Sequence, residues 1–118
     1  LVIWQVDDDP VHLFLAARLI RRANPRAEIV SFESARDAAE RLLSEKPDII
    51  MLDLNMPEMD GWEFLEAVQH RSNLPGIVVL TSSIDPRDKA RAFSFACVKD
   101  FLVKPVRMAD LVGVASPG

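Results

Sequence analysis

Acidic, hydroxyl and lysine side chains stand directly after apolar runs of this chain. Asp7 and Asp8 follow LVIWQV, and Asp53 follows DIIML. Thr81 follows GIVVL, and Lys104 follows FLV. In an open parallel sheet the carboxyl ends of the strands share one edge, where ligands bind. We therefore expect these five residues to converge into a single site, although the sequence scatters them.

The three carboxylates determine which chemistry this set could support. Adjacent strands lie about 4.8 Å apart, so acids at neighbouring strand ends disfavour each other's ionisation and raise at least one pKa. A hard divalent cation such as Mg²⁺ would relieve the repulsion, and it often shares its site with phosphate oxygens. Asp53 could then act as a nucleophile that forms an aspartyl phosphate. The Lys104 ammonium and the Thr81 hydroxyl would neutralise charge on the transferred phosphoryl group.

The segments that must position these residues alternate between strand-like and helical patterns. Five apolar runs predict strands at residues 1–6, 28–32, 48–52, 76–80 and 100–103. Each run precedes a segment of helical period, which is typical of an α/β fold with a parallel sheet. Asp9 and Pro10 are suited to begin the first helix. The buried face of that helix is predicted to consist of Val11, Phe14, Leu15 and Leu19.

The composition indicates one domain, residues 1–118, with a single packed core. The chain has 118 residues, 49% of them hydrophobic, and a formal net charge of -4. This acidic balance offers no basic surface for phosphate backbones, so direct nucleic-acid binding is not expected. The single cysteine, Cys97, cannot form an internal disulfide, and no apolar run approaches the roughly 20 residues that cross a bilayer. We expect a soluble cytoplasmic protein without membrane contact.

Four motifs in this order resemble the receiver domain of two-component response regulators, of the chemotaxis-regulator-like superfamily. They are VDDDP at 6–10, LDLNMPEMDG at 52–61, LTSS at 80–83 and FLVKP at 101–105. The resemblance covers essentially the whole chain. It implies a flavodoxin-like fold, in which a doubly wound five-stranded parallel sheet of order 2-1-3-4-5 carries helices on both faces. Cys97 departs from the family pattern, which usually has a glycine before the fifth strand.

The resemblance also implies the chemistry of the site. Asp53 would accept a phosphoryl group from the phosphohistidine of a sensor histidine kinase or a histidine phosphotransfer protein. Mg²⁺ would be held by Asp8, Asp53 and the backbone carbonyl of Asn55, with Asp7 acting through a metal-bound water. The protein would then be a signalling phosphoacceptor rather than a turnover enzyme. It would catalyse only its own phosphorylation and dephosphorylation.

Further residues are expected to act as the switch. In the family that the chain resembles, Lys104 would grip the phosphoryl group, and its bond to Pro105 would be cis. Thr81 would swing toward the phosphate, and Phe101 would turn inward behind it. These movements would remodel the surface formed by the fourth helix, the fifth strand and the fifth helix. That surface would act on a downstream protein or on an output domain outside this chain.

Several residues also allow a purely structural interpretation. Asp9 is expected to be a helix cap. His12 and His70 invite a phosphohistidine role, but we expect both to be solvated helix residues. Cys97 is expected to be a small buried apolar residue. Phe101 could be a plain core residue instead of a switch.

Three other functions share part of this residue pattern. A phosphatase of the haloacid dehalogenase type also uses a strand-end aspartate, but its nucleophile comes before the paired acids, whereas here Asp7 and Asp8 precede Asp53. In such a phosphatase, a second aspartate would also stand where this chain has Asn55. A nucleotide-binding flavodoxin-like module would need phosphate donors in its first loop, which here contains three acids. A degenerate receiver that binds proteins without phosphorylation is disfavoured because the set of reactive residues is complete.

Overall fold

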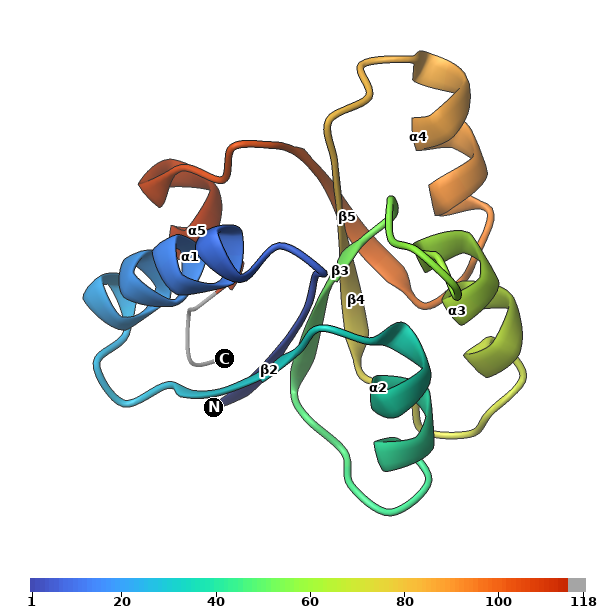
Figure 1. Ribbon diagram of the computed structural model, residues 1–118, viewed down its shortest axis with the longest axis horizontal. Coiled ribbons are helices and arrows are strands. Elements are labelled where there is room, and N and C mark those ends of the chain that lie inside the picture. Colours follow the sequence, from blue (N-terminus) through green and yellow to red (C-terminus); the bar gives the residue numbers. More distant parts are fainter. Residues whose placement is uncertain (115–118) are drawn as a thin grey trace.

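The computed structural model describes residues 1–114, with side chains described as far as Leu111. Its centre is a sheet of five parallel strands in the order β2-β1-β3-β4-β5 (Figure 1). The strands are β1 (Val2–Val6), β2 (Glu28–Phe32), β3 (Ile49–Asp53), β4 (Gly76–Thr81) and β5 (Val98–Val103). The predicted doubly wound, flavodoxin-like α/β fold is therefore confirmed.

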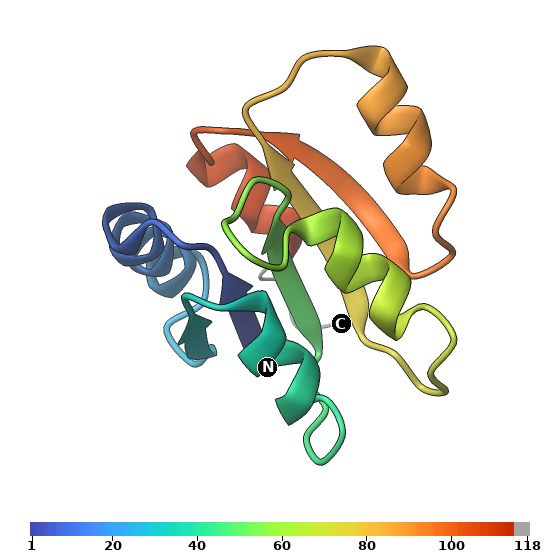
Figure 2. The same cartoon turned by 45° about the vertical axis from the view of Figure 1, so that its right-hand side comes forward.

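Helices cover both faces of the sheet. They are α1 (Pro10–Ala23), α2 (Ala35–Arg41), α3 (Gly61–Val68), α4 (Pro86–Phe93) and α5 (Met108–Val114). Helices α1 and α5 lie on one face, and α2, α3 and α4 lie on the other (Figures 1 and 2). Within residues 1–114, no helix is long and apolar enough to cross a membrane.

The central strand β3 shows why its sequence is almost wholly apolar. Ile50 and Leu52 are fully buried in the cluster that also holds Phe64 of α3. Met51 points to the opposite cluster, which contains Ile20 of α1. Successive side chains of a strand point to opposite faces, so a strand covered on both sides is apolar at every position.

The buried face of α1 differs from the prediction. Val11, Phe14 and Leu15 were expected in the core, but they are 64%, 61% and 51% exposed. Leu19 is half-buried and packs at the edge of a core cluster. The buried residues of the helix are instead Leu13, Ala16, Ala17 and Ile20. Both sets have helical spacing, but the second contains two alanines, which allow the helix to lie close to the sheet.

Strand register brings the carboxyl ends of four strands to one edge of the sheet. Val6 of β1 lies beside Leu52 of β3, and Thr81 of β4 lies beside Val103 of β5. The next residue after each of Val6, Leu52 and Val103 therefore lies at the same edge of the sheet. These residues are Asp7, Asp53 and Lys104.

Candidate functional site

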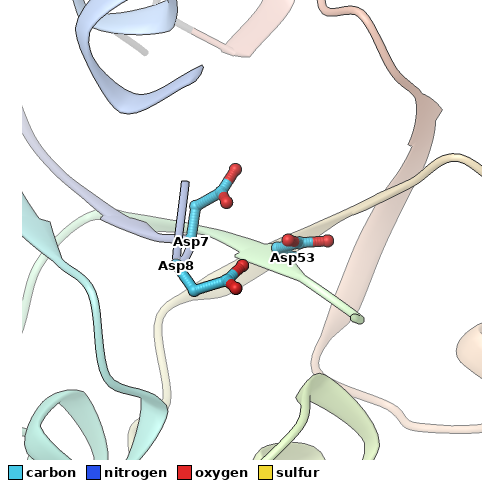
Figure 3. A group of neighbouring side chains, drawn as sticks. All are labelled: Asp7, Asp8 and Asp53. Carbon is cyan, nitrogen blue, oxygen red and sulfur yellow. The ribbon is translucent and has the colours of Figure 1, made fainter. Parts of the chain in front are cut away.

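Three carboxylates meet at this edge, at the ends of β1 and β3. Asp7, Asp8 and Asp53 each offer one carboxylate oxygen, and these three oxygens lie within 4.8 Å of one another (Figure 3). Asp7 and Asp53 are 2% and 3% exposed, whereas Asp8 is open to solvent. The predicted acidic cluster is thus brought together with one member facing outward.

Lys104 bridges the two buried acids. Its Nζ lies 2.9 Å from Oδ2 of Asp7 and 3.1 Å from Oδ2 of Asp53. The backbone N–H of Lys104 donates to the carbonyl of Thr81, which fixes the end of β5 against β4. Its bond to Pro105 is cis, as expected. Burial acts to lower the pKa of Lys104, but the two carboxylates outweigh this and raise it, so the ammonium is charged.

Three hydrogen-bond donors contact the carboxylate of Asp7. Nδ1 of His12 lies 2.6 Å from Asp7 Oδ2, and the backbone N–H of Asp9 donates to Asp7 Oδ1 over 2.9 Å. Burial acts to raise the pKa of Asp7. Hydrogen bonds from His12, from the Asp9 N–H and from Lys104 outweigh burial and lower this pKa to about 2. Asp7 is therefore ionised at neutral pH.

His12 was predicted to be a solvated helix residue, and this prediction is wrong. Its side chain is 15% exposed, and the ring reaches back from the first turn of α1 to Asp7. Its place one turn beyond the acid pair was a signal for this contact. The expectation for Asp9 is confirmed, because its side chain caps α1 by accepting the N–H of Val11. His70 is exposed, as expected, but it lies in the turn after α3 and not in the helix.

Asp53 has a different environment from Asp7. The backbone N–H of Asn55 donates to its Oδ1 over 3.2 Å, and Lys104 contacts its Oδ2. Burial raises the pKa of Asp53, and the charge of Asp7 raises it further against the opposing effect of Lys104. A buried carboxylate with few donors and a raised pKa is a candidate for chemistry.

The loop after β3 returns sharply to begin α3. The N–H of Gly61 donates to the carbonyl of Leu54, and Asp60 forms a capping box with Glu63. A Cβ at Gly61 would lie 2.6 Å from the carbonyl oxygen of Asp53, so glycine alone fits this close approach. Asn55 is exposed on this loop. The loop therefore keeps Asn55 next to Asp53.

The hydroxyl of Thr81 is linked to the start of α4. Thr81 is buried, and its Oγ1 accepts the N–H of Ser83 over 3.0 Å. The Ser83 hydroxyl donates to Asp88 Oδ2 over 2.6 Å. Phe101 of β5 is half-buried, and it lines a surface pocket together with residues of the β4–α4 loop, of α4 and of β5: Ser83, Ile84, Asp85, Pro86, Lys89 and Val103. The structure thus links Thr81 to α4 and leaves Phe101 between core and surface.

The oxygens of the acidic cluster fit a hard divalent cation. Three carboxylates in one small volume repel each other, and oxygen donors of this kind are the ligands that Mg²⁺ prefers. The Lys104 ammonium compensates part of the charge but contacts only the Asp7 and Asp53 oxygens among these three acids. Asp8 is exposed to solvent and has no such contact with Lys104.

Cys97 lies in the turn before β5 and is half-buried. Burial raises the pKa of its thiol, so the thiol is protonated at neutral pH. The side chain packs at the border of the larger core cluster. An apolar packing role therefore fits, although the residue is less buried than expected.

Comparison with known proteins identifies this arrangement. The chain matches the response regulator receiver domain over residues 3–116. A two-component response regulator of Arabidopsis thaliana is 36% identical over 109 residues, which are 90% of this chain and 20% of that protein. A protein-glutamate methylesterase/protein-glutamine glutaminase of Archaeoglobus fulgidus is 35% identical over 115 residues, which are 93% of this chain and 32% of that protein. The chain thus spans between a fifth and a third of the length of these two relatives.

Solved structures agree with the sequence relatives. A two-component response regulator from Cytophaga hutchinsonii superposes with a TM-score of 0.86 at 31% identity, covering 96% of this chain and 92% of that one. The chemotaxis protein CheY4 of Vibrio cholerae superposes with a TM-score of 0.82 at 26% identity, covering 96% and 93%. These structures share the sheet at whose edge the acids, the threonine and the lysine lie. The chain therefore belongs to the response regulator receiver domains, which serve two-component signalling.

Proposed function

We propose that Asp53 is the phosphoacceptor of this receiver domain. The observation that carries the proposal is the bridge from Lys104 to both buried acids, because it aims an ammonium at the carboxylate with the raised pKa. An Asp53 oxygen would form the bond to phosphorus while the phosphorus–nitrogen bond of a phosphohistidine breaks. The ring nitrogen keeps the electron pair of that bond and takes up a proton. Lys104 stabilises the charge on the phosphoryl oxygens.

Mg²⁺ is the proposed cofactor. Asp8, Asp53 and the backbone carbonyl of Asn55 would hold it, and Asp7 would act through a bound water. When bound, the ion supplies positive charge to the acids and to the phosphoryl oxygens. Asp8 is suited to the role because it is exposed and lies beside the two buried acids.

The proposed switch begins at Thr81 and Phe101. In the unphosphorylated protein the Thr81 hydroxyl accepts the Ser83 N–H, and Ser83 is tied to Asp88 of α4. A turn of Thr81 toward the phosphoryl group would break the first of these contacts and loosen the second. Phe101 borders the same β4–α4 segment and would turn inward. These movements would change the surface formed by α4, β5 and α5, which would then bind a downstream protein or output domain.

The proposed donor is a sensor histidine kinase or a histidine phosphotransfer protein. Support comes from the outer face of α1, where Val11, Phe14 and Leu15 are exposed within the helix that begins three residues after Asp7. Contiguous exposed apolar side chains mark protein contact sites. A donor protein seated on this face would bring its histidine close to Asp53. We further propose a single domain, a cytoplasmic location and no turnover beyond self-phosphorylation and autodephosphorylation.

Intact-mass spectrometry tests the phosphoacceptor. The protein is incubated with acetyl phosphate, with and without Mg²⁺, beside Asp53→Asn and the control Asp100→Asn, which removes an exposed acid on β5. We expect a Mg²⁺-dependent gain of one phosphoryl group in the wild type and the control, and none in Asp53→Asn. Absence of the adduct in the wild type at early times, with no binding of beryllofluoride, would favour the degenerate receiver that binds proteins without phosphate.

The docking face is tested with a phosphorylated histidine phosphotransfer protein as donor. Phe14→Ser should slow transfer from this protein about tenfold and leave the rate with acetyl phosphate unchanged. Leu43→Ser is the matched control, because Leu43 is also an exposed apolar residue but follows α2. Equal slowing with both phosphodonors would argue against a docking role for α1.

A further inference from the structure

His12 is the one described residue of α1 whose side chain contacts an acid of the cluster. Its Nδ1 lies 2.6 Å from Asp7 Oδ2, while Lys104 Nζ lies 2.9 Å from the same oxygen. An ionised carboxylate accepts hydrogen bonds and cannot donate one. The proton of the His12 contact must therefore be on Nδ1. Oδ2 of Asp7 then uses both lone pairs, one for His12 and one for Lys104.

Among the described residues, no polar group other than Asp7 forms a hydrogen bond with the ring of His12. Its Nε2 is buried and has no hydrogen-bond partner among the described residues. The backbone beside it is fixed, because Nε2 of Gln5 on β1 donates to the carbonyl of Leu13 over 3.2 Å. His12 is one of the residues that line a pocket of about 320 Å³ between α1 and the segment after β5. The contact with Asp7 thus determines where the imidazole lies.

The two donors on Asp7 Oδ2 differ in what phosphorylation would do to them. Lys104 also contacts Asp53, and in the proposed function it turns to the phosphoryl group on that residue. Asp7 would then lose a charged donor although it remains buried. His12 is on another element and has no part in that movement. The His12 bond and the Asp9 N–H remain to hold the carboxylate.

We infer that His12 is a positioning residue: its Nδ1–H holds the Asp7 carboxylate in one orientation, so that Lys104 can move to the phosphoryl group without releasing Asp7. This inference rests on the proposed function of the site. Groups that orient a metal-binding carboxylate or its bound water commonly change metal affinity by 10- to 100-fold when they are removed. Loss of the His12 donor should therefore weaken Mg²⁺ binding.

The test compares His12→Leu, which removes the donor, with His12→Asn, whose amide N–H can occupy the place of Nδ1–H. His70→Leu is the matched control, because His70 is exposed beyond the end of α3. Mg²⁺ is titrated into each protein, and amide chemical shifts are followed by NMR. We expect the dissociation constant to rise about tenfold in His12→Leu, to return to within threefold of wild type in His12→Asn, and to stay unchanged in His70→Leu.

Phosphorylation by acetyl phosphate gives the second comparison. The rate of His12→Leu should fall at low Mg²⁺ and approach that of the wild type at saturating Mg²⁺. Unchanged Mg²⁺ affinity in a folded His12→Leu protein, or loss of affinity that His12→Asn fails to restore, would overturn the inference. If the wild type binds Mg²⁺ with this pattern but takes no phosphoryl group, the proposed function fails and the positioning of Asp7 by His12 stands.

The metal-free wild type supplies a readout that needs no variant. Long-range ¹H–¹⁵N spectra should show a proton on Nδ1 of His12. A ring protonated on Nε2 alone would overturn the inference even if His12→Leu failed to fold.

Discussion

Asp7 and Asp53 stand at the ends of neighbouring strands, are almost equally buried and share the same lysine, yet their pKa values move in opposite directions. Asp7 has a pKa lowered to about 2, whereas the pKa of Asp53 is raised. The difference lies in the donors. Asp7 accepts from His12, from the Asp9 N–H and from Lys104, while Asp53 has the Asn55 N–H and a share of Lys104.

This contrast separates an anchored acid, Asp7, from the proposed phosphoacceptor, Asp53. Each donor fixes one lone pair and stabilises the ionised form, so the carboxylate with more donors is the better structural anchor. Asp53 accepts fewer hydrogen bonds than Asp7. It also lies beside the negative charge of Asp7, which disfavours its ionisation. The fold therefore favours ionisation at Asp7 and leaves Asp53 as the group that gains from a new positive partner.

Removal of the shared lysine should have the largest effect. Lys104→Met leaves two buried carboxylates without their ammonium, and breaking a buried ion pair in this way costs about 3 kcal/mol of unfolding free energy. We expect the loss in urea denaturation at pH 7 and its partial recovery with Mg²⁺, which binds the folded state. Phosphorylation by acetyl phosphate should slow about 100-fold. Unchanged stability would mean that Lys104 does not compensate both acids.

Asp7→Asn should destabilise the protein by about 2 kcal/mol at pH 7, because the ionised form of Asp7 is favoured by the fold. The folded pKa lies below the unfolded value of about 3.9, so this contribution is present above that value. It is lost as the pH falls from about 4 through 2. Urea denaturation of both proteins across this range should therefore show their difference shrinking toward acid.

Asp53→Asn should act in the opposite direction. Ionised Asp53 is held against burial and the charge of Asp7, so its removal should raise the free energy of unfolding at pH 7, by less than the loss expected for Asp7→Asn. The folded pKa is raised, so the cost is present above it and is relieved as the pH falls through it. The gain of the variant over the wild type should thus shrink toward acid. Equal signs for Asp7→Asn and Asp53→Asn would refute the contrast between the two acids.

The fold and the strand-end residues of the candidate site could be predicted because topology determines them. A residue at the end of a parallel strand, or directly after it, reaches the carboxyl edge whatever its neighbours do, and this rule located Asp7, Asp53 and Lys104. The cis bond to Pro105 and the strand order followed from the resemblance, and the structure agrees. These features depend on position along the chain.

The rotation of α1 could not be predicted in the same way. Two sets of apolar residues on this helix had the correct spacing, and the larger side chains suggested the wrong one. His12 is four residues before Ala16, which is buried, so the same rotation that exposes Phe14 turns His12 toward the sheet. The two errors have one physical source. Close packing of small alanines decided an orientation that periodicity left open.

The crowding at Gly61 has a consequence for protein engineering. The carbonyl oxygen of Asp53 would lie 2.6 Å from a Cβ there, and the Leu54 carbonyl receives the Gly61 N–H, so the two ends of the loop are clamped to one another. Residues 55–60 between them form a cassette with fixed attachment points. We expect that the side chains between these two contacts can be varied without moving Asp53, provided that the glycine is retained. Libraries aimed at the proposed phosphorylated state should therefore vary residues 56–59 and retain Asn55, Asp60 and Gly61, which contact Asp53 or begin α3.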